Sequence, residues 1–153
     1  MPPVVRPYEP RDAEGVKSLV EAVLPEYGLQ VDFSGADADL VDVPAHYEKS
    51  GGAFWVIEDA GRLVGMGGLR RPEPHTGEVR KMYFLPELRG RGLGRAMLDR
   101  MVSFARENGI KTLTLETASV LKEAVRLYER FGFTPDASLL RTHRCDAAYR
   151  LDL

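Results

Sequence analysis

The sequence is poor in cysteine and histidine and lacks long apolar runs. Cys145 is its single cysteine, which excludes a disulfide within one chain and any zinc site built on several cysteines. His46, His75 and His143 do not occur at the spacing of metal ligands, so we predict no metal site. The apolar runs are too short to cross a membrane, and residues 1–12 contain no signal-peptide core. We therefore expect a cytoplasmic protein without a membrane partner.

The chain also lacks an excess of charge of either sign. Its 153 residues include 21 Lys and Arg against 23 Asp and Glu, a formal net charge of -2. A basic field over the whole chain is absent, and we expect no nucleic-acid partner. No repeat, low-complexity stretch or long linker divides the chain, which predicts a single domain over residues 1–153. No interface signature is visible, so a monomer and a homodimer both agree with the sequence.

The first half of the chain alternates strand-like and helix-like patterns. These patterns predict, in order, a strand at 4–6, a helix from the N-cap Asp12 to Gly28, a short helix within 39–48, strands at 53–58 and 62–69, a loop at 71–77 and a strand at 78–85. The three later strands are joined by short connections, which favours an antiparallel run.

The second half predicts helices and strands in turn. The expected elements are a helix at 93–108 followed by Gly109, a strand at 111–116, a helix from the cap Ser119 to Arg130, and closing strands at 137–141 and 147–153. A strand–helix–strand connection favours a parallel pair. The predicted fold class is therefore α/β, with a mixed sheet and helices on its faces.

A glycine-rich segment between a strand and a helix carries the strongest chemical signal. Residues 89–95 hold three glycines and three arginines, and residues 80–100 hold six cations against two acids. Such a turn presents backbone N–H groups at the positive end of a helix dipole, where anions bind. A turn that only packs the helix on the sheet is the alternative, but it does not require this many glycines and arginines.

Two common nucleotide motifs do not fit this segment. A Walker A loop needs Lys and then Ser or Thr after its last glycine, whereas Gly94 is followed by Arg95 and Ala96. A dinucleotide fingerprint started from Gly90 needs a third glycine where Arg95 stands. We therefore do not expect this segment to bind ATP as a Walker A loop does, or NAD as a dinucleotide-binding loop does.

The pattern Arg89-x-x-Gly92-x-Gly94 resembles the acetyl-CoA signature of the GNAT N-acetyltransferase superfamily. The strand at 78–87 resembles the central strand of that family, and residues 127–133 resemble its Leu-Tyr-x-x-x-Gly-Phe segment. The resemblance covers nearly the whole chain in element order. It implies a GNAT-type fold, in which a mostly antiparallel sheet contains one splayed parallel pair.

The resemblance also implies acetyl-CoA as co-substrate and assigns residues to it. Met82, Tyr83 and Phe84 are expected to splay away at a bulge and to pair with the pantetheine arm. The loop is expected to surround the pyrophosphate, mainly through backbone N–H groups, with Arg89, Gly90, Arg91, Gly92, Leu93, Gly94 and Arg95. One departure is Leu121, which stands where many members have an asparagine that touches the cofactor.

Two residues are candidates for proton transfer. Glu78 resembles a catalytic glutamate of the histone-acetylating branch and is the expected base, although a solvated glutamate paired with Arg80 or Lys81 is the alternative. Tyr128 matches the family tyrosine that donates a proton to the sulfur of departing CoA. On periodicity alone Tyr128 is a core residue.

The sequence thus predicts an acetyl-CoA-dependent N-acetyltransferase that acts on a small-molecule or peptide amine by direct attack in a ternary complex. The alternative is a non-catalytic acyl-CoA-binding sensor or assembly module on the same fold. A nucleic-acid domain that uses residues 89–95 is disfavoured because no aromatic stacking set accompanies the arginines. The acceptor has no motif of its own. Residues 25–52 are expected to select it, with Tyr27 lining its pocket.

Overall fold

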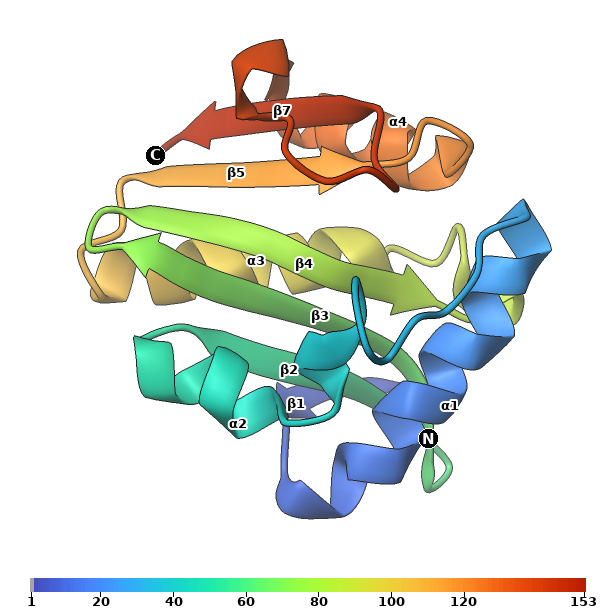
Figure 1. Ribbon diagram of the computed structural model, residues 1–153. Coiled ribbons are helices and arrows are strands. Elements are labelled where there is room, and N and C mark those ends of the chain that lie inside the picture. The colour runs from blue at the N-terminus through green and yellow to red at the C-terminus, as the bar shows by residue number, and fades with distance from the viewer. Residues whose placement is uncertain (1) are drawn as a thin grey trace.

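The computed structural model describes residues 2–153 and is built on a seven-stranded sheet (Figure 1). The strand order is β1-β2-β3-β4-β5-β7-β6, and all neighbours are antiparallel except β4 and β5. The strands are β1 (Val4–Pro7), β2 (Ala53–Asp59), β3 (Arg62–Glu73), β4 (Thr76–Phe84), β5 (Thr112–Thr117), β6 (Thr134–Pro135) and β7 (Ala147–Asp152).

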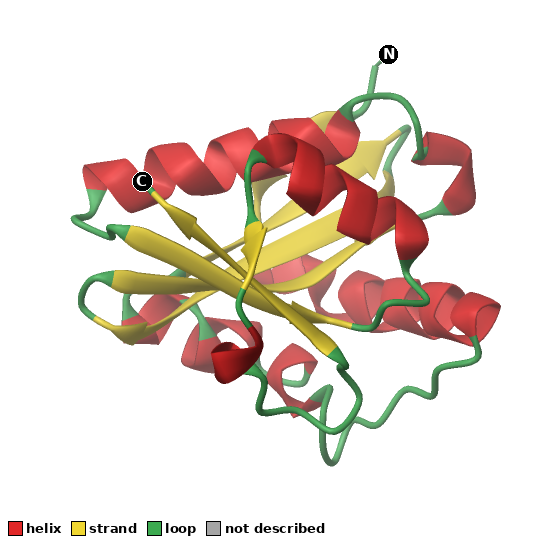
Figure 2. Ribbon diagram, turned by 90° about the horizontal axis from the view of Figure 1, so that it is seen from above, coloured by secondary structure: helices red, strands yellow, loops and turns green. Residues whose placement is uncertain are grey.

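Helices cover both faces of the sheet (Figures 1 and 2). The helices are α1 (Ala13–Val23) and α2 (Val43–His46) on one face, and α3 (Leu93–Glu107) and α4 (Lys122–Phe131) on the other. The predicted fold class, a mixed sheet between helices, is confirmed. Among the described residues, no helix is long and apolar enough to span a membrane.

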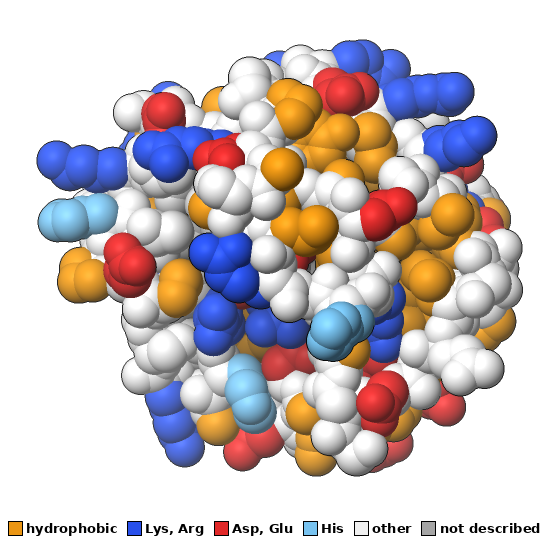
Figure 3. All heavy atoms as spheres, turned by 45° about the horizontal axis from the view of Figure 1, so that its top comes forward, with side chains coloured by type: hydrophobic (Ala, Val, Ile, Leu, Met, Phe, Trp, Pro, Cys, Tyr) orange, Lys and Arg blue, Asp and Glu red, His pale blue; other side chains and the backbone are white. Residues whose placement is uncertain are grey.

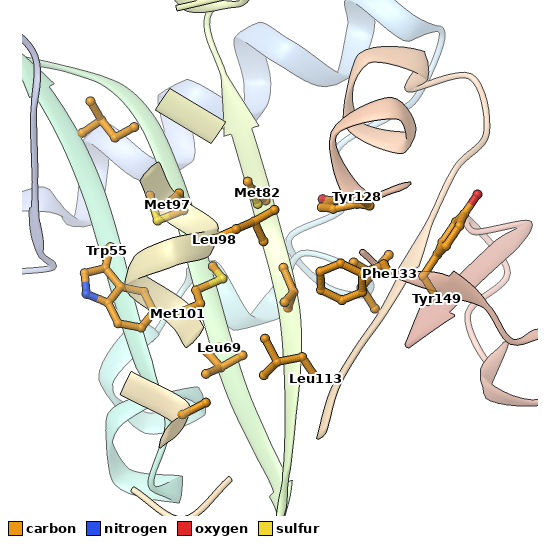
Figure 4. Close-up of a cluster of buried hydrophobic side chains, with 14 of the residues drawn as sticks. Trp55, Leu69, Met82, Met97, Leu98, Met101, Leu113, Tyr128, Phe133 and Tyr149 are labelled. Carbon is orange, nitrogen blue, oxygen red and sulfur yellow. The ribbon is translucent and has the colours of Figure 1, made fainter. Parts of the chain in front are cut away.

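Each long helix buries one apolar stripe against the sheet, as its periodicity predicts. The buried stripe of α1 contains Val16, Leu19, Val20 and Val23. The buried stripe of α3 contains Met97, Leu98, Met101 and Ala105 (Figure 4). The two stripes belong to separate hydrophobic clusters, one on each face of the sheet.

A bulge in β4 opens the sheet at its centre. Relative to β3, strand β4 has one extra residue between Arg80 and Tyr83. Lys81, inside this bulge, has a φ of 53°, which is rare for a residue with a side chain. Pairing between β4 and β5 ends at Val79 and Leu115, and beyond these residues the two strands diverge (Figure 1). The splayed parallel pair that the family resemblance implies is therefore present.

The predicted loop at 71–77 is wrong. Strand β3 continues to Glu73 and β4 begins at Thr76, so the connection between them is only Pro74 and His75. Pro72 is tolerated inside β3 because the register between the two strands is irregular there.

Two local predictions near the C-terminus are also wrong. The segment expected as a strand at 137–141 begins with a short 3-10 helix, because the side chain of Asp136 accepts a hydrogen bond from the backbone N–H of Ser138. Ser119 does not cap α4, which begins only at Lys122. Its hydroxyl donates instead to Asp146 at 2.7 Å.

Candidate active site

Two cavities meet where β4 and β5 diverge. The larger, about 520 Å³, lies between the end of β4, the glycine-rich loop and α4. The smaller, about 50 Å³, lies between the β4 bulge, the end of β5 and the loop that leads into β7. Residues that line both cavities are Met82, Tyr83, Leu121, Ala124 and Tyr128. These five residues form the dividing wall between the two cavities.

The glycine-rich loop shapes one side of the larger cavity. Gly92 is the N-cap of α3 and has a φ of 78°, a conformation that glycine adopts without strain. No side chain caps this helix end, so its first N–H groups are available to a ligand. A Cβ on Gly94 would lie 2.5 Å from Cδ2 of Leu127, so this glycine permits the close approach of α3 to α4. The loop therefore has the form of an anion cradle.

Positive charge surrounds this cavity. Arg89, Arg95, Arg126 and Arg130 line it, and Glu123 is its one acidic residue within residues 2–153. Arg126 and Arg130 were not among the residues predicted from the sequence. They are four residues apart, which places both on one face of α4. Helical periodicity in the sequence predicts this shared face.

The three arginines of the loop differ in their surroundings. Arg89 donates to the carbonyl of Phe84 at 3.0 Å and forms an ion pair with Glu26. It therefore links the glycine-rich loop to the 3-10 helix Leu24–Tyr27 that follows α1. Arg95 lies over the ring of Phe131, at 5.2 Å from its centroid. Arg91 is exposed and does not line the cavity. The other residues predicted for the cofactor, which are Met82, Tyr83, Phe84, Gly90, Gly92, Leu93 and Gly94, all line it.

Tyr27 lines the larger cavity and not the smaller one. Its ring lies beneath the guanidinium of Arg89, with 5.3 Å between ring centroid and Cζ. Its hydroxyl donates to Glu123 at 3.2 Å. Tyr27 therefore connects the 3-10 helix after α1 to α4 across the cavity.

Tyr128 occupies the dividing wall. Its side chain is buried against Phe133, and its hydroxyl end faces the strand of Met82 (Figure 4). Burial raises the pKa of Tyr128 well above its ordinary value, and the phenol of Tyr83 adds to this. The hydroxyl makes no hydrogen bond to any described residue. A protonated phenol with a free donor therefore stands between the two cavities.

Tyr83 is a second phenol in this wall. It is half-buried, and burial raises the pKa of Tyr83 to about 12 although Arg144 opposes the shift. From the sequence, Tyr83 is expected to contact the cofactor through its backbone, and its side chain has no predicted role. The bulge beside it, which strand periodicity does not reveal, directs the side chain into the wall.

Charged residues surround the smaller cavity. Lys81 contacts Asp39 at 3.0 Å and Asp37 at 3.5 Å, and Arg144 donates to Asp37 through both terminal nitrogens. Both Asp37 and Lys81 are almost fully buried. This buried network joins the 31–42 segment, the β4 bulge and the loop before β7.

Glu78 lines neither cavity. It lies in β4 and accepts a hydrogen bond from Nε of Arg70 at 2.9 Å. Arg80, which does line the smaller cavity, approaches the same carboxylate to 3.9 Å. The carboxylate of Glu78 therefore lies outside the lining of both cavities and beside Arg80, which does line the smaller one.

No group of three or more His, Cys, Asp or Glu residues within residues 2–153 is arranged to hold a metal ion. Cys145 is free and half-buried at the smaller cavity, and burial raises the pKa of its thiol.

A family model described as the acetyltransferase (GNAT) family matches residues 17–133. The chain belongs to this family. It is an acetyltransferase, as the sequence resemblance predicts. The family uses acetyl-CoA.

Relatives and solved structures agree with this assignment. The chain is 40% identical over 139 residues to the uncharacterized N-acetyltransferase YjgM of Escherichia coli K12, covering 86% of this chain and 81% of that protein. A GNAT-family acetyltransferase structure from Staphylococcus aureus has the same fold, with a TM-score of 0.91 at 21% identity over 99% of both chains. The structure of yncA from Salmonella typhimurium, solved with acetyl-CoA, has a TM-score of 0.76 at 21% identity, covering 99% of this chain and 94% of that one.

Proposed function

We propose that this acetyltransferase transfers an acetyl group from acetyl-CoA to a primary amine by direct attack in a ternary complex. When bound, acetyl-CoA supplies the acetyl group as a thioester, whose C–S bond breaks as the C–N bond to the amine forms. The residues present fit this co-substrate. The diverging end of β4 leaves backbone groups unpaired, the glycine-rich loop offers N–H groups, and four arginines surround the cavity.

Three parts of the site have separate tasks in this proposal. The Tyr128 phenol gives its proton to the leaving thiolate, and its raised pKa keeps that proton on the oxygen at neutral pH. The backbone of Met82 to Phe84 aligns the co-substrate, and the N-terminus of α3 binds its diphosphate. The single observation that carries the proposal is a buried Tyr128 whose hydroxyl is free and which lines both cavities.

One assay distinguishes the proposed acetyl transfer from the alternative, a non-catalytic acyl-CoA sensor. Free CoA is measured with acetyl-CoA and a panel of primary amines, and acetyl-CoA binding is measured by calorimetry on the same preparation. We expect CoA release above hydrolysis with at least one amine. Binding without any release across the panel contradicts the proposal and favours the sensor.

The glycine-rich loop can be tested by adding a negative charge to it. Gly92→Asp places a carboxylate at the N-cap of α3, where the diphosphate is proposed to bind, and aspartate tolerates a positive φ better than most residues. We expect the Kd for acetyl-CoA to rise about tenfold, which corresponds to about 1.4 kcal/mol. Calorimetric titration measures this change.

Gly109→Asp is the matched control for this variant. Gly109 has a φ of 76°, against 78° for Gly92, and a Cβ at either position meets nothing within 4 Å. Gly109 lies just beyond the opposite end of α3. Its substitution therefore has a similar backbone cost but should leave the Kd unchanged. Equal weakening in both variants contradicts the proposed diphosphate site.

Glu78 is proposed as the base and acts through a water, because its carboxylate does not line the smaller cavity. A lysine-like amine with a pKa near 10.4 requires about 4.6 kcal/mol for deprotonation at pH 7. We expect Glu78→Gln to lower kcat/KM about tenfold at pH 7. The deficit should shrink toward pH 9, since the amine then loses its proton more readily. The exposed Glu73→Gln is the control, and a deficit that stays constant with pH contradicts the base role.

A further inference from the structure

The smaller cavity contains one arginine, Arg80, whose guanidinium has only long ion-pair contacts and donates no hydrogen bond within residues 2–153. Arg80 makes no hydrogen bond to any of residues 2–153, although its side chain is only 30% exposed. The nearest carboxylate oxygens, Oδ2 of Asp39 and Oε1 of Glu78, are both 3.9 Å away, beyond hydrogen-bond distance. A guanidinium carries five N–H donors in a planar fork, and a half-buried one normally finds acceptors. The cavity therefore presents an unused binding group.

The acids near Arg80 are already engaged by other residues. Asp39 accepts the hydroxyl of Tyr47, and Lys81 contacts its other oxygen at 3.0 Å. Glu78 accepts from Arg70 at 2.9 Å. Neither carboxylate is therefore free to turn toward Arg80 without losing a partner that it already holds.

The other charged groups of the cavity are engaged as well. Lys81 donates to the carbonyl of Ala36 at 2.9 Å, and Arg144 is bonded to Asp37. The carboxylate of Glu116 in β5 accepts the backbone N–H of Thr142 at 2.8 Å, so it is turned toward the loop that leads into β7. Basic side chains gather near the centre of the face in Figure 3, with acidic ones beside them. Of the three cations that line the smaller cavity, Arg80 is the one without a hydrogen bond to any of residues 2–153.

We infer that the amine acceptor carries a carboxylate a few bonds from its amine, as a small amino acid does, and that Arg80 binds this carboxylate. An arginine fork matches a carboxylate in bidentate geometry, and a partly buried pair of this kind is strong. Arg80 and Tyr128 line the same cavity of about 50 Å³, so the amine and its anion must lie close together. The inference rests on the proposed acetyl transfer and adds the substrate class.

The first test compares amino acids with their amides. With acetyl-CoA saturating, kcat and KM are measured for glycine, the common L-amino acids and β-alanine, and for the amide of each. For the best acceptor, we expect the acid to exceed its amide in kcat/KM about 10- to 100-fold, with the difference in KM. An acid and amide of equal kcat/KM overturns the inference and leaves acetyl transfer intact.

Variants of Arg80 then connect this preference to the side chain. Arg80→Met retains the length of the chain without its charge, and should raise KM for the acid about 10- to 100-fold while kcat and the KM for acetyl-CoA change less than about threefold. Arg80→Lys keeps the charge without the planar fork, and its KM for the acid should lie between those of the wild type and Arg80→Met. Arg150→Met, in β7 and outside the lining of both cavities, should match the wild type. Equal loss with acid and amide overturns the role of Arg80.

Calorimetry separates this inference from the proposed function. Each amino acid is titrated into protein saturated with CoA, for the wild type and for Arg80→Met. Binding to the wild type and not to Arg80→Met supports the inference even when no acetylation is detected, in which case only the proposed function fails. Absence of both binding and turnover across the amino acids overturns the inference.

Discussion

Tyr128→Phe should lower kcat about 10²- to 10⁴-fold, the range that a lost proton donor produces. The change removes one hydroxyl that has no hydrogen-bond partner among the described residues, so no buried group loses its partner. The ring stays packed against Phe133, at 5.8 Å between centroids. We therefore expect acetyl-CoA affinity and the midpoint of thermal unfolding to be nearly unchanged, which separates a catalytic loss from a folding defect.

Two control variants make this result specific to Tyr128. Tyr149→Phe removes a phenol on β7 whose hydroxyl donates to Glu129 at 3.4 Å, away from both cavities, and should retain wild-type turnover. Tyr83→Phe removes the other phenol of the dividing wall. Steady-state CoA release is the measurement for all three variants. Full activity in Tyr128→Phe, or its loss only in Tyr83→Phe, contradicts the assignment of the proton donor.

Asp37→Ala should lower the free energy of unfolding by about 3 kcal/mol. The side chain of Asp37 has no exposed surface and faces both Lys81 and Arg144. Its removal leaves the side chain of Arg144 with the carbonyl of Gln30, and leaves Lys81 with the carbonyl of Ala36 and with Asp39 as its one remaining carboxylate partner among residues 2–153. Breaking a buried pair on one side costs more than the pair contributes, because the remaining charge stays desolvated.

Chemical denaturation measures this effect, and Asp42→Ala is its control. Asp42 is an exposed N-cap of α2 whose loss should cost about 1 kcal/mol. The double variant Asp37→Ala, Arg144→Met should recover part of the stability, since it removes both charges of the pair. A loss no larger than that of Asp42→Ala shows that the buried network contributes little.

The stability that Asp37 supplies depends on pH. Burial by itself raises the pKa of Asp37, but hydrogen bonds from Arg144 and from the backbone N–H of Asp32, together with the charge of Lys81, lower it below its ordinary value. A carboxyl with a depressed pKa stabilises the fold above its unfolded pKa, near 3.9, and loses this contribution as the pH falls through the folded pKa. The difference between wild type and Asp37→Ala should therefore be complete at pH 7 and shrink below about pH 4.

Much of the site follows from local sequence. The glycines of residues 89–95 and the position of Tyr128 on an amphipathic helix are local patterns, and the structure places both at the larger cavity. The order of strands and helices is local as well, because hydrophobic periodicity and turn residues define each element. The ends of the elements are specified less accurately by these local patterns, as the continuation of β3 beyond the predicted end at residue 69 to Glu73 shows.

The role of Arg80 could not be read from the sequence. There it is one of six cations between residues 80 and 100, and nothing local distinguishes it from the others. Its distinction is that every nearby acid has another partner, which depends on contacts between segments distant in the chain. The arginines of the loop show the same limit, because Arg89 and Arg91 look equivalent in sequence, yet Arg89 is bound to Glu26 and Arg91 is exposed.

The amino-acid sequence by itself determined the family, the mixed sheet between helices and the glycine-rich loop, because short-range pattern and backbone conformation specify them. Only the tertiary structure decided which side chains line the two cavities. Arg144 and Asp37 are 107 residues apart and meet beneath the β4 bulge, and that bulge places Tyr83 in the wall between the cavities. Such contacts depend on strand register and on the divergence of β4 from β5, which no local pattern encodes.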